Sequence, residues 1–342
     1  MEQYKRLGRQ TLRMASPPAV LSYAAVAGSK EGQGPLAASF DRVYSDDLLG
    51  EDSWEKAESH MQRDALNLAL QKVKLSPGDL PMIFAGDLLN QCAGTTFALR
   101  ESGIPFYGLY GACSTMAESL ALAAMAIDGG FVPTAGAMTS SHYSSAERQY
   151  RFPLDYGGQR TPTAQWTATG SGAVILSQDG PGPCLRHIVT GRIVDAGITD
   201  AANMGAAMAP AACDSLSGFF RDTGLTPKDF DLIVTGDLGA VGYRAVRDLM
   251  AAEGYPMGAG YNDCGLMLFD LEAQDVHAGG SGCGCSALVL CGLILEEMRK
   301  GSWNEVLFCG TGALLSPVTA AQGDSIPAVC HGIHLSNTKG GK

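Results

Sequence analysis

Gly111-Ala112-Cys113-Ser114-Thr115 is a tight turn between an apolar strand and an apolar helix, and the chain contains a second turn of this kind. The second turn reads Gly282-Cys283-Gly284-Cys285-Ser286-Ala287. The apolar runs after the two turns, Met116 to Ile127 and Ala287 to Met298, both predict helices. A repeated strand-turn-helix unit constrains the fold of the whole chain.

Two further pairs of segments support a duplication. The segment Met82 to Leu88 and the segment Leu232 to Leu238 are both apolar and end in Gly-Asp-Leu. The segment Gly170 to Ser177 likewise matches Gly310 to Ser316. The matches follow the same order in both parts of the chain, so we expect two related halves, 1–180 and 181–342.

The residue patterns predict alternating helices and strands. Helices are expected over 53–73, 95–101, 116–127, 211–221, 241–253 and 287–299. Strands are expected over 82–85, 104–109, 135–138, 173–177, 185–194, 232–235, 305–310 and 313–316. Residues 139–168 have no clear periodicity and are interpreted as a polar, aromatic-rich insertion. Such alternation favours an α/β fold with mixed sheets covered on both faces.

The composition excludes several classes of protein. A net charge of -11 over 342 residues argues against nucleic-acid binding and against a polybasic membrane anchor. No apolar run approaches the ~18 residues of a membrane span, and residues 1–13 lack an apolar signal core. We therefore expect a soluble protein made in the cytosol. The ten cysteines show no paired zinc spacing, so no metal or cofactor is expected.

Cys113 is the candidate reactive residue. A thiol at a helix N-terminus lies near unpaired N–H groups, which lower its pKa and can hold an oxyanion or a carboxylate. The alternative is that Cys113 is a small apolar residue at a tight turn.

The duplicated turns resemble the thiolase superfamily, which includes the condensing ketoacyl synthases. The resemblance implies a duplicated, layered αβαβα fold with mixed five-stranded sheets, and a homodimer. In that superfamily the turn cysteine carries an acyl group, and a histidine and a second histidine or asparagine polarise its carbonyl. Here Gly236 and Gly280 fall at those positions. A glycine supplies no such group, so the condensing machinery is expected to be absent.

Longer motifs resemble the stage V sporulation protein AD family of endospore-forming bacteria. These motifs are Gly86 to Gln91, Ser140 to His142, Ala146 to Gln149, Asp155 to Gln159, Asp195 to Asp200, Met204 to Pro210, Gly279 to Cys283 and Gly310 to Pro317. The resemblance implies a non-enzymatic protein that binds dipicolinic acid, either free or as its calcium chelate. It also implies action in dipicolinate uptake with other stage V sporulation proteins at the spore inner membrane.

Dipicolinate is a flat ring with two carboxylates, so a site for it needs a slot lined by polar groups. The candidate ligand-binding residues are Cys113, Ser114, His142, Arg148, Tyr156, Gly236, Gly280 and His331. Tyr143, Tyr150, Phe152 and Trp166 could add an aromatic wall. His142 could equally be structural, Arg148 could pair with a nearby acid, and the aromatic residues could pack within the insertion. Asp87 and Asp237 are interpreted as caps or turn formers.

An enzyme is the alternative hypothesis. Cys113 could serve an acyltransferase or thioesterase with a base such as His142. A base has to reach the thiol or the substrate, so the missing second-half histidine favours the binding protein.

Overall fold

The computed structural model describes residues 5–150 and 160–338, and most of its strands form one long mixed sheet, while β8 and β13 form a separate two-stranded sheet. The strand order is β12-β11-β14-β15-β10-β3-β9-β7-β5-β6, which divides into two sets of five. β10 and β3 join the sets through the antiparallel pair of Cys184 and Ala19.

Strands and helices alternate along most of the described chain. The strands are β1 Arg6–Leu7, β2 Thr11–Arg13, β3 Ala19–Ala27, β4 Arg42–Val43, β5 Ile83–Gly86, β6 Phe106–Leu109, β7 Thr134–Ser141, β8 Trp166–Thr167, β9 Gly170–Ser177, β10 Cys184–Val189, β11 Leu232–Thr235, β12 Tyr261–Asp263, β13 Gly280–Ser281, β14 Glu305–Ala313 and β15 Ala328–Ser336. The helices are α1 Trp54–Lys72, α2 Ala93–Leu99, α3 Thr115–Asp128, α4 Tyr143–Tyr150, α5 Met204–Thr223, α6 Gly239–Ala252, α7 Cys264–Met267, α8 Cys283–Val289, α9 Leu295–Lys300 and α10 Pro317–Ala321. A π-helical turn, Leu290–Ile294, links α8 to α9.

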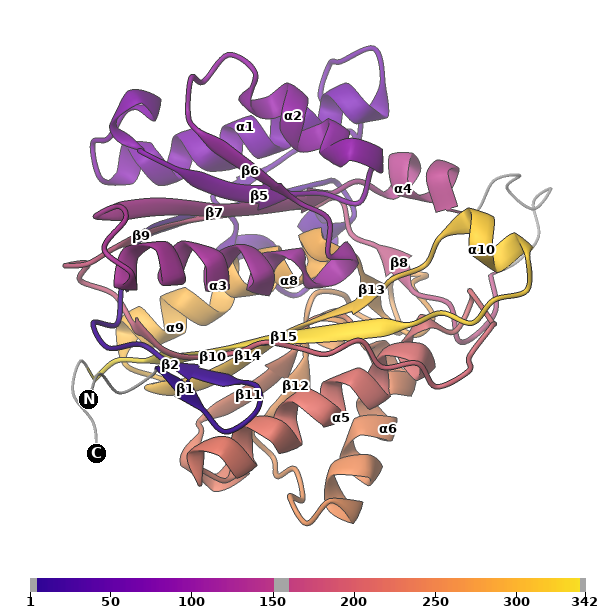
Figure 1. Ribbon diagram of the computed structural model, residues 1–342. Coiled ribbons are helices and arrows are strands. Elements are labelled where there is room, and N and C mark those ends of the chain that lie inside the picture. Colours follow the sequence, from indigo (N-terminus) through magenta and orange to yellow (C-terminus); the bar gives the residue numbers. More distant parts are fainter. Residues whose placement is uncertain (1–4, 151–159, 339–342) are drawn as a thin grey trace.

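The two sets of strands have the same topology. β5 pairs in parallel with β6 and β7, and β11 pairs in parallel with β12 and β14. Antiparallel pairs then join β7 to β9 and β9 to β3, and likewise β14 to β15 and β15 to β10. Figure 1 shows α3 and α8 between the two sets, α1 and α2 outside one, and α5 and α6 outside the other. The expected duplicated αβαβα fold is confirmed.

The strand order corrects one of the matched segments. Gly310 to Ala313 lies at the end of β14, which occupies the place of β7 rather than that of β9. The positional counterpart of β9 is β15, which the sequence patterns did not predict. The small residues of Gly170 to Ser177 and of Gly310 to Ser316 both pack closely against helices. The two segments therefore match because their packing is alike, although they do not occupy equivalent positions in the two sets of strands.

Several predicted boundaries were also wrong. Residues 305–316 form one strand ending at Ala313 rather than two, and β10 ends at Val189. α5 begins at Met204, well before the predicted start, because its buried face tolerates Pro210 inside the helix. The segment 139–168 is partly regular, since it contains the end of β7, α4 and β8.

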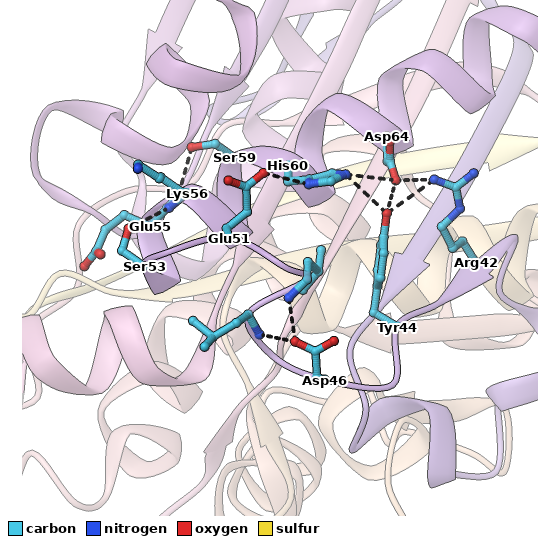
Figure 2. A network of polar contacts seen from close by, with 12 residues as sticks. Arg42, Tyr44, Asp46, Glu51, Ser53, Glu55, Lys56, Ser59, His60 and Asp64 are labelled. Atoms are coloured by element: carbon cyan, nitrogen blue, oxygen red, sulfur yellow. Dashed lines mark hydrogen bonds and ion pairs between the residues drawn. The ribbon is translucent and has the colours of Figure 1, made fainter.

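The loop before α1 is held by the polar network in Figure 2. The Asp64 carboxylate accepts hydrogen bonds from the Tyr44 hydroxyl and the Arg42 guanidinium, and His60 Nδ1 lies 3.0 Å from Glu51 Oε1. These contacts hold the loop that contains Asp47, whose carbonyl meets His142 just before α4. In the described residues, no helix combines the length and apolar character needed to cross a membrane.

Candidate functional site

The turn before α3 has the geometry of a sharp elbow. β6 ends at Leu109, a 3-10 turn covers Ala112–Ser114, and α3 begins at Thr115. Ala112 adopts φ +52°, in the left-handed region that a residue with a Cβ rarely occupies. Such strain persists only where the surroundings hold it, and it often marks a functional site. The elbow places Cys113 at a cavity, with 7% of the residue exposed.

The cavity is small, with a volume of about 40 Å³. That volume accommodates only a few water molecules, since one water needs roughly 10–15 Å³ on this measure. Both halves of the chain contribute to the lining. The lining residues are Leu88, Ala112, Cys113, Ala146, Glu147, Tyr150, Thr167, Met204, Ser281, Ala313 and Leu315.

Asp237 lies behind Cys113 and is fully buried. Its Oδ1 accepts a hydrogen bond from Thr311 Oγ1 at 2.7 Å. Its Oδ2 accepts from Gly282 N at 2.9 Å and from Ser281 Oγ at 3.1 Å. The Cys113 thiol also interacts with this carboxylate electrostatically. Burial raises the pKa of Asp237, and these donors oppose part of that rise.

The environment of Cys113 favours the neutral thiol. Burial raises the pKa of Cys113 well above its ordinary value, and the neighbouring Asp237 raises it further. The backbone N–H of Gly282 lowers this pKa but does not outweigh the other effects. The sequence predicted the opposite shift from the helix N-terminus, which is a smaller effect than full burial beside a carboxylate.

The second glycine-and-cysteine turn meets the first at this site. Cys283 begins α8 and packs in one cluster with Cys113, Leu88 and Ala146. Its thiol donates to the carbonyl of Ser140 at 2.9 Å. Burial raises the pKa of Cys283 as well. The duplication therefore brings two protonated thiols to one place.

One wall of the cavity is provided by α4. The Tyr150 hydroxyl donates to the carbonyl of Leu88 at 2.5 Å and lies 3.0 Å from the Tyr110 hydroxyl. Glu147 lies one helical turn earlier, and Thr167 Oγ1 on β8 donates to Glu147 Oε1 at 3.4 Å. The described lining contains no lysine, arginine or histidine. The described lining is mostly apolar and includes one carboxylate, that of Glu147.

The structure separates His142 and Arg148 from the cavity. The ring of His142 is fully buried, with Nε2 2.7 Å from the carbonyl of Asp47 and Nδ1 accepting from Ser144 N. Burial lowers its pKa. Arg148 pairs with Glu55 and lies over the ring of Trp54, on the side of α4 that faces α1.

Three other predicted residues have backbone roles. The hydroxyl of Ser114 donates to the carbonyl of Gly111 at 2.6 Å. Gly280 pairs with Trp166 in the short ladder of β13 and β8. His331 Nδ1, on β15, accepts from Gly191 N at 3.2 Å.

Cys113 and Tyr150 are the predicted residues that the described structure places at the cavity. Tyr143 and Trp166 instead stack on each other, with ring centroids 3.8 Å apart. Tyr156 and Phe152 lie outside the described residues. Gly236 does not line the cavity and packs against Gly310 and Thr311, and Asp237 is the residue of that turn that interacts with Cys113. The Gly-Asp-Leu sequence shared by both halves was the signal that could have identified it.

The shared Gly-Asp-Leu motif has different uses in the two halves. In the first half, Asp87 accepts from the N–H groups of Leu89 and Thr95 and so caps the turn before α2, as predicted. In the second half, Asp263 caps α6 by accepting from Leu238 N and Gly239 N. Asp237 therefore does not cap α6; it accepts from Gly282 N in the other turn and faces Cys113.

Solved structures that match this architecture include 3-oxoacyl-[acyl-carrier-protein] synthase III enzymes and OleA. The 3-oxoacyl-[acyl-carrier-protein] synthase III of Aquifex aeolicus matches with a TM-score of 0.58 at 12% identity, over 93% of this chain and 99% of that one. OleA of Xanthomonas campestris also matches with a TM-score of 0.58, at 11% identity, over 96% of this chain and 99% of that one. Identities this low show the fold alone, which is thiolase-like.

The family is defined by closer matches. The model of the stage V sporulation protein AD family matches residues 8–336. Stage V sporulation protein AD of Bacillus subtilis (strain 168) is 44% identical over 336 residues, which cover 98% of this chain and 99% of that protein. The chain belongs to the stage V sporulation protein AD family, and is thus a sporulation protein with a thiolase-like fold.

Proposed function

We propose that this protein binds dipicolinic acid at the Cys113 cavity, without chemical turnover, and acts in dipicolinate uptake with membrane partners during spore formation. Family membership supports the sporulation role. The observation that carries the choice of site is the convergence of both duplicated turns, through Cys113 and Cys283, on one cavity at a strained elbow.

The charges at the cavity favour the calcium chelate as ligand. Free dipicolinate carries two negative charges, whereas Glu147 and Asp237 already bring carboxylates to the site. Taking a dianion into an acidic, buried site costs more than taking the chelate, whose calcium neutralises both carboxylates. Thr167 and Ser281 offer hydroxyl groups at the same surface.

The cavity has to open before it can hold this ligand. A volume of about 40 Å³ is far below that of an aromatic dicarboxylate. Tyr150, Met204 and Leu315 form the partly exposed part of the wall, whereas Cys113 and Ser281 form the buried part. We propose that the partly exposed side chains rotate outward when the ligand enters.

A turnover role for Cys113 has less support. An acyltransferase or thioesterase needs a thiolate or a base that makes one. The raised pKa of Cys113 and the neighbouring carboxylate favour a neutral thiol. We therefore propose that Cys113 contacts the ligand as a neutral thiol and forms no covalent bond to it.

Calorimetry on the full chain tests the proposal. We expect the calcium chelate to bind more tightly than dipicolinate in EDTA. Benzoate should bind more weakly by one to two decades, because a lost charge-assisted hydrogen bond costs roughly 1.5–3 kcal/mol. Cys113→Ala should weaken chelate binding partially, and Leu315→Trp should abolish it by filling the cavity.

Cys213→Ala and Leu249→Trp, at α5 and α6, are matched controls. Equal affinity for benzoate, or wild-type binding by Leu315→Trp, would contradict the proposal.

A further inference from the structure

A second cavity of about 310 Å³ lies beside β10, the strand of the second set that pairs with β3. It lies among the β1–β2 hairpin, β10, the segment after α5 and the start of β14. Its lining residues are Leu7, Arg13, Arg186, His187, Thr223, Leu225, Asp229, Phe230, Glu305 and His334. A volume of this size is in the range of small-molecule sites.

A bulge in β10 brings two basic side chains to this cavity. The pairing of β10 with β15 shifts register between Leu185 and His187, which leaves Arg186 as the extra residue. Successive residues of a regular strand point to opposite faces, but a bulge re-aims one of them. Arg186 and His187 accordingly both line the cavity, and Arg13 lies opposite His187 on β2.

Behind His187 lies a buried relay of polar groups. His334 Nε2 lies 2.7 Å from Glu305 Oε2, and the Nδ1 atoms of His334 and His187 are 2.9 Å apart. A carboxylate can only accept, so Nε2 of His334 carries a proton. The two Nδ1 atoms share one proton. Within the described residues, Nε2 of His187 has no hydrogen-bond partner and belongs to a ring that lines the cavity.

The charges around His187 favour an anion. Burial, together with the neighbouring His334, Arg186 and Arg13, lowers the pKa of His187 to about 3. Glu305 has both oxygens engaged, by His334 and by Ser336 Oγ at 2.7 Å. The remaining acid in the lining, Asp229, accepts from the backbone and hydroxyl of Thr226.

We propose that this cavity binds a small carboxylic acid with an apolar body, whose carboxylate lies among Arg13, Arg186 and Nε2 of His187. Leu7, Leu225 and Phe230 supply the apolar wall for its hydrocarbon part. The anion selects the state in which His187 Nε2 carries a proton towards it and His334 donates from Nδ1. That state holds one proton more than the neutral pair, so binding takes up protons and weakens as pH rises.

The test uses hexanoate as the probe and calorimetry on the full chain. We expect one hexanoate per chain, with at least tenfold weaker binding in Arg186→Gln and in Arg13→Gln. Arg100→Gln, at an exposed arginine on the opposite side of the fold, should bind like the wild type. Affinity should fall between pH 6 and pH 8.5, and titrations in buffers of different ionisation enthalpy should show proton uptake.

Two further ligands separate the contribution of the carboxylate to affinity from that of the apolar body. Hexanol, which keeps the apolar body and lacks the charge, should bind at least tenfold more weakly. Inorganic phosphate should compete weakly, because it offers nothing to the apolar wall. Equal binding of hexanoate and hexanol, or equal loss in Arg186→Gln and Arg100→Gln, would overturn the proposal. His187→Gln should abolish proton uptake. If the His187→Gln protein does not fold, the hexanoate affinities of Arg186→Gln and Arg13→Gln test the proposal.

Discussion

The thiol of Cys113 and the carboxylate of Asp237 interact electrostatically, so the end of β11 in one half meets the elbow before α3 in the other. Both residues are buried, and Asp237 accepts hydrogen bonds from Thr311, Ser281 and Gly282. A carboxylate at this place raises the pKa of the thiol and so keeps it protonated. The pair therefore distinguishes this site from one that requires a nucleophilic thiolate.

Replacing Asp237 by asparagine should lower the pKa of Cys113, because it removes the neighbouring negative charge and keeps the side-chain size. Alkylation by iodoacetamide, followed by mass spectrometry from pH 7 to pH 10, reports the thiol pKa separately from access. We expect roughly tenfold faster labelling at pH 8 for each unit by which the pKa falls. Asp275→Asn, at an exposed carboxylate, is the control. An unchanged pH profile with native circular dichroism would show that the pair has no electrostatic role.

Condensing activity should be absent, and Gly236→His should not restore it. A Cβ at Gly236 would lie 3.1 Å from Thr311 N, so an imidazole there displaces β14 and the bond from Thr311 to Asp237. We expect lower thermal stability and weaker chelate binding. No product should form from acetyl-CoA and malonyl donors. Claisen product from the unmodified protein would contradict the binding function.

Stability should decrease as the pH rises from 6.5 to 8.5. Burial raises the pKa of Glu31 to about 8, whereas the unfolded chain loses this proton near pH 4.5. The folded state therefore keeps a proton that the unfolded state has released, and this stabilisation disappears as pH passes through the folded pKa. Burial also raises the pKa of Glu58 to about 8. The prediction starts at pH 6.5 because the pKa of buried His187 is lowered from that value, so below pH 6.5 His187 makes stability increase with pH.

Differential scanning calorimetry checks this behaviour. The wild-type Tm should fall by several degrees across the window. Glu31→Gln should make the fall in Tm smaller, since the amide keeps an acceptor for Thr169 N and cannot titrate, while Glu58 still does. Glu101→Gln, at an exposed glutamate, should follow the wild type. A wild-type Tm that does not change between these pH values would contradict the prediction.

We expect a homodimer in which two copies of β6 pair across a two-fold axis. β6 is the last strand in the sheet order, and Tyr107, Tyr110 and Phe97 are 58%, 49% and 54% exposed around it. Its counterpart β12 is covered, with Tyr261 only 3% exposed. An uncovered edge is self-complementary when two copies meet antiparallel.

Light scattering coupled to size exclusion tests the dimer. Tyr107→Lys should shift the protein to a monomer because the charge lies within the paired strands. Ile193→Lys, at an exposed residue remote from β6, should leave the mass unchanged. A monomeric wild-type protein at micromolar concentration would rule out this interface.

Features that depend on neighbours along the chain were determined by the sequence alone. The turns at Cys113 and Cys283, the apolar runs after them and the family motifs predicted the duplicated thiolase-like fold, because local periodicity and turn chemistry recur with each copy of the unit. Asp87 was correctly interpreted as a cap, since a capping carboxylate serves the N–H groups that follow it closely in sequence.

The tertiary structure alone decided which side chains meet. Nothing near Asp237 in the sequence distinguishes it from Asp87, and only the folded sheet places it against Cys113 while Asp263 takes over the capping role. His142 likewise faces the carbonyl of Asp47 because the loop before α1 passes there. Contacts between segments distant in the chain depend on strand order, register and bulges, and the burial that results reverses the pKa shift expected for Cys113 from its helix terminus.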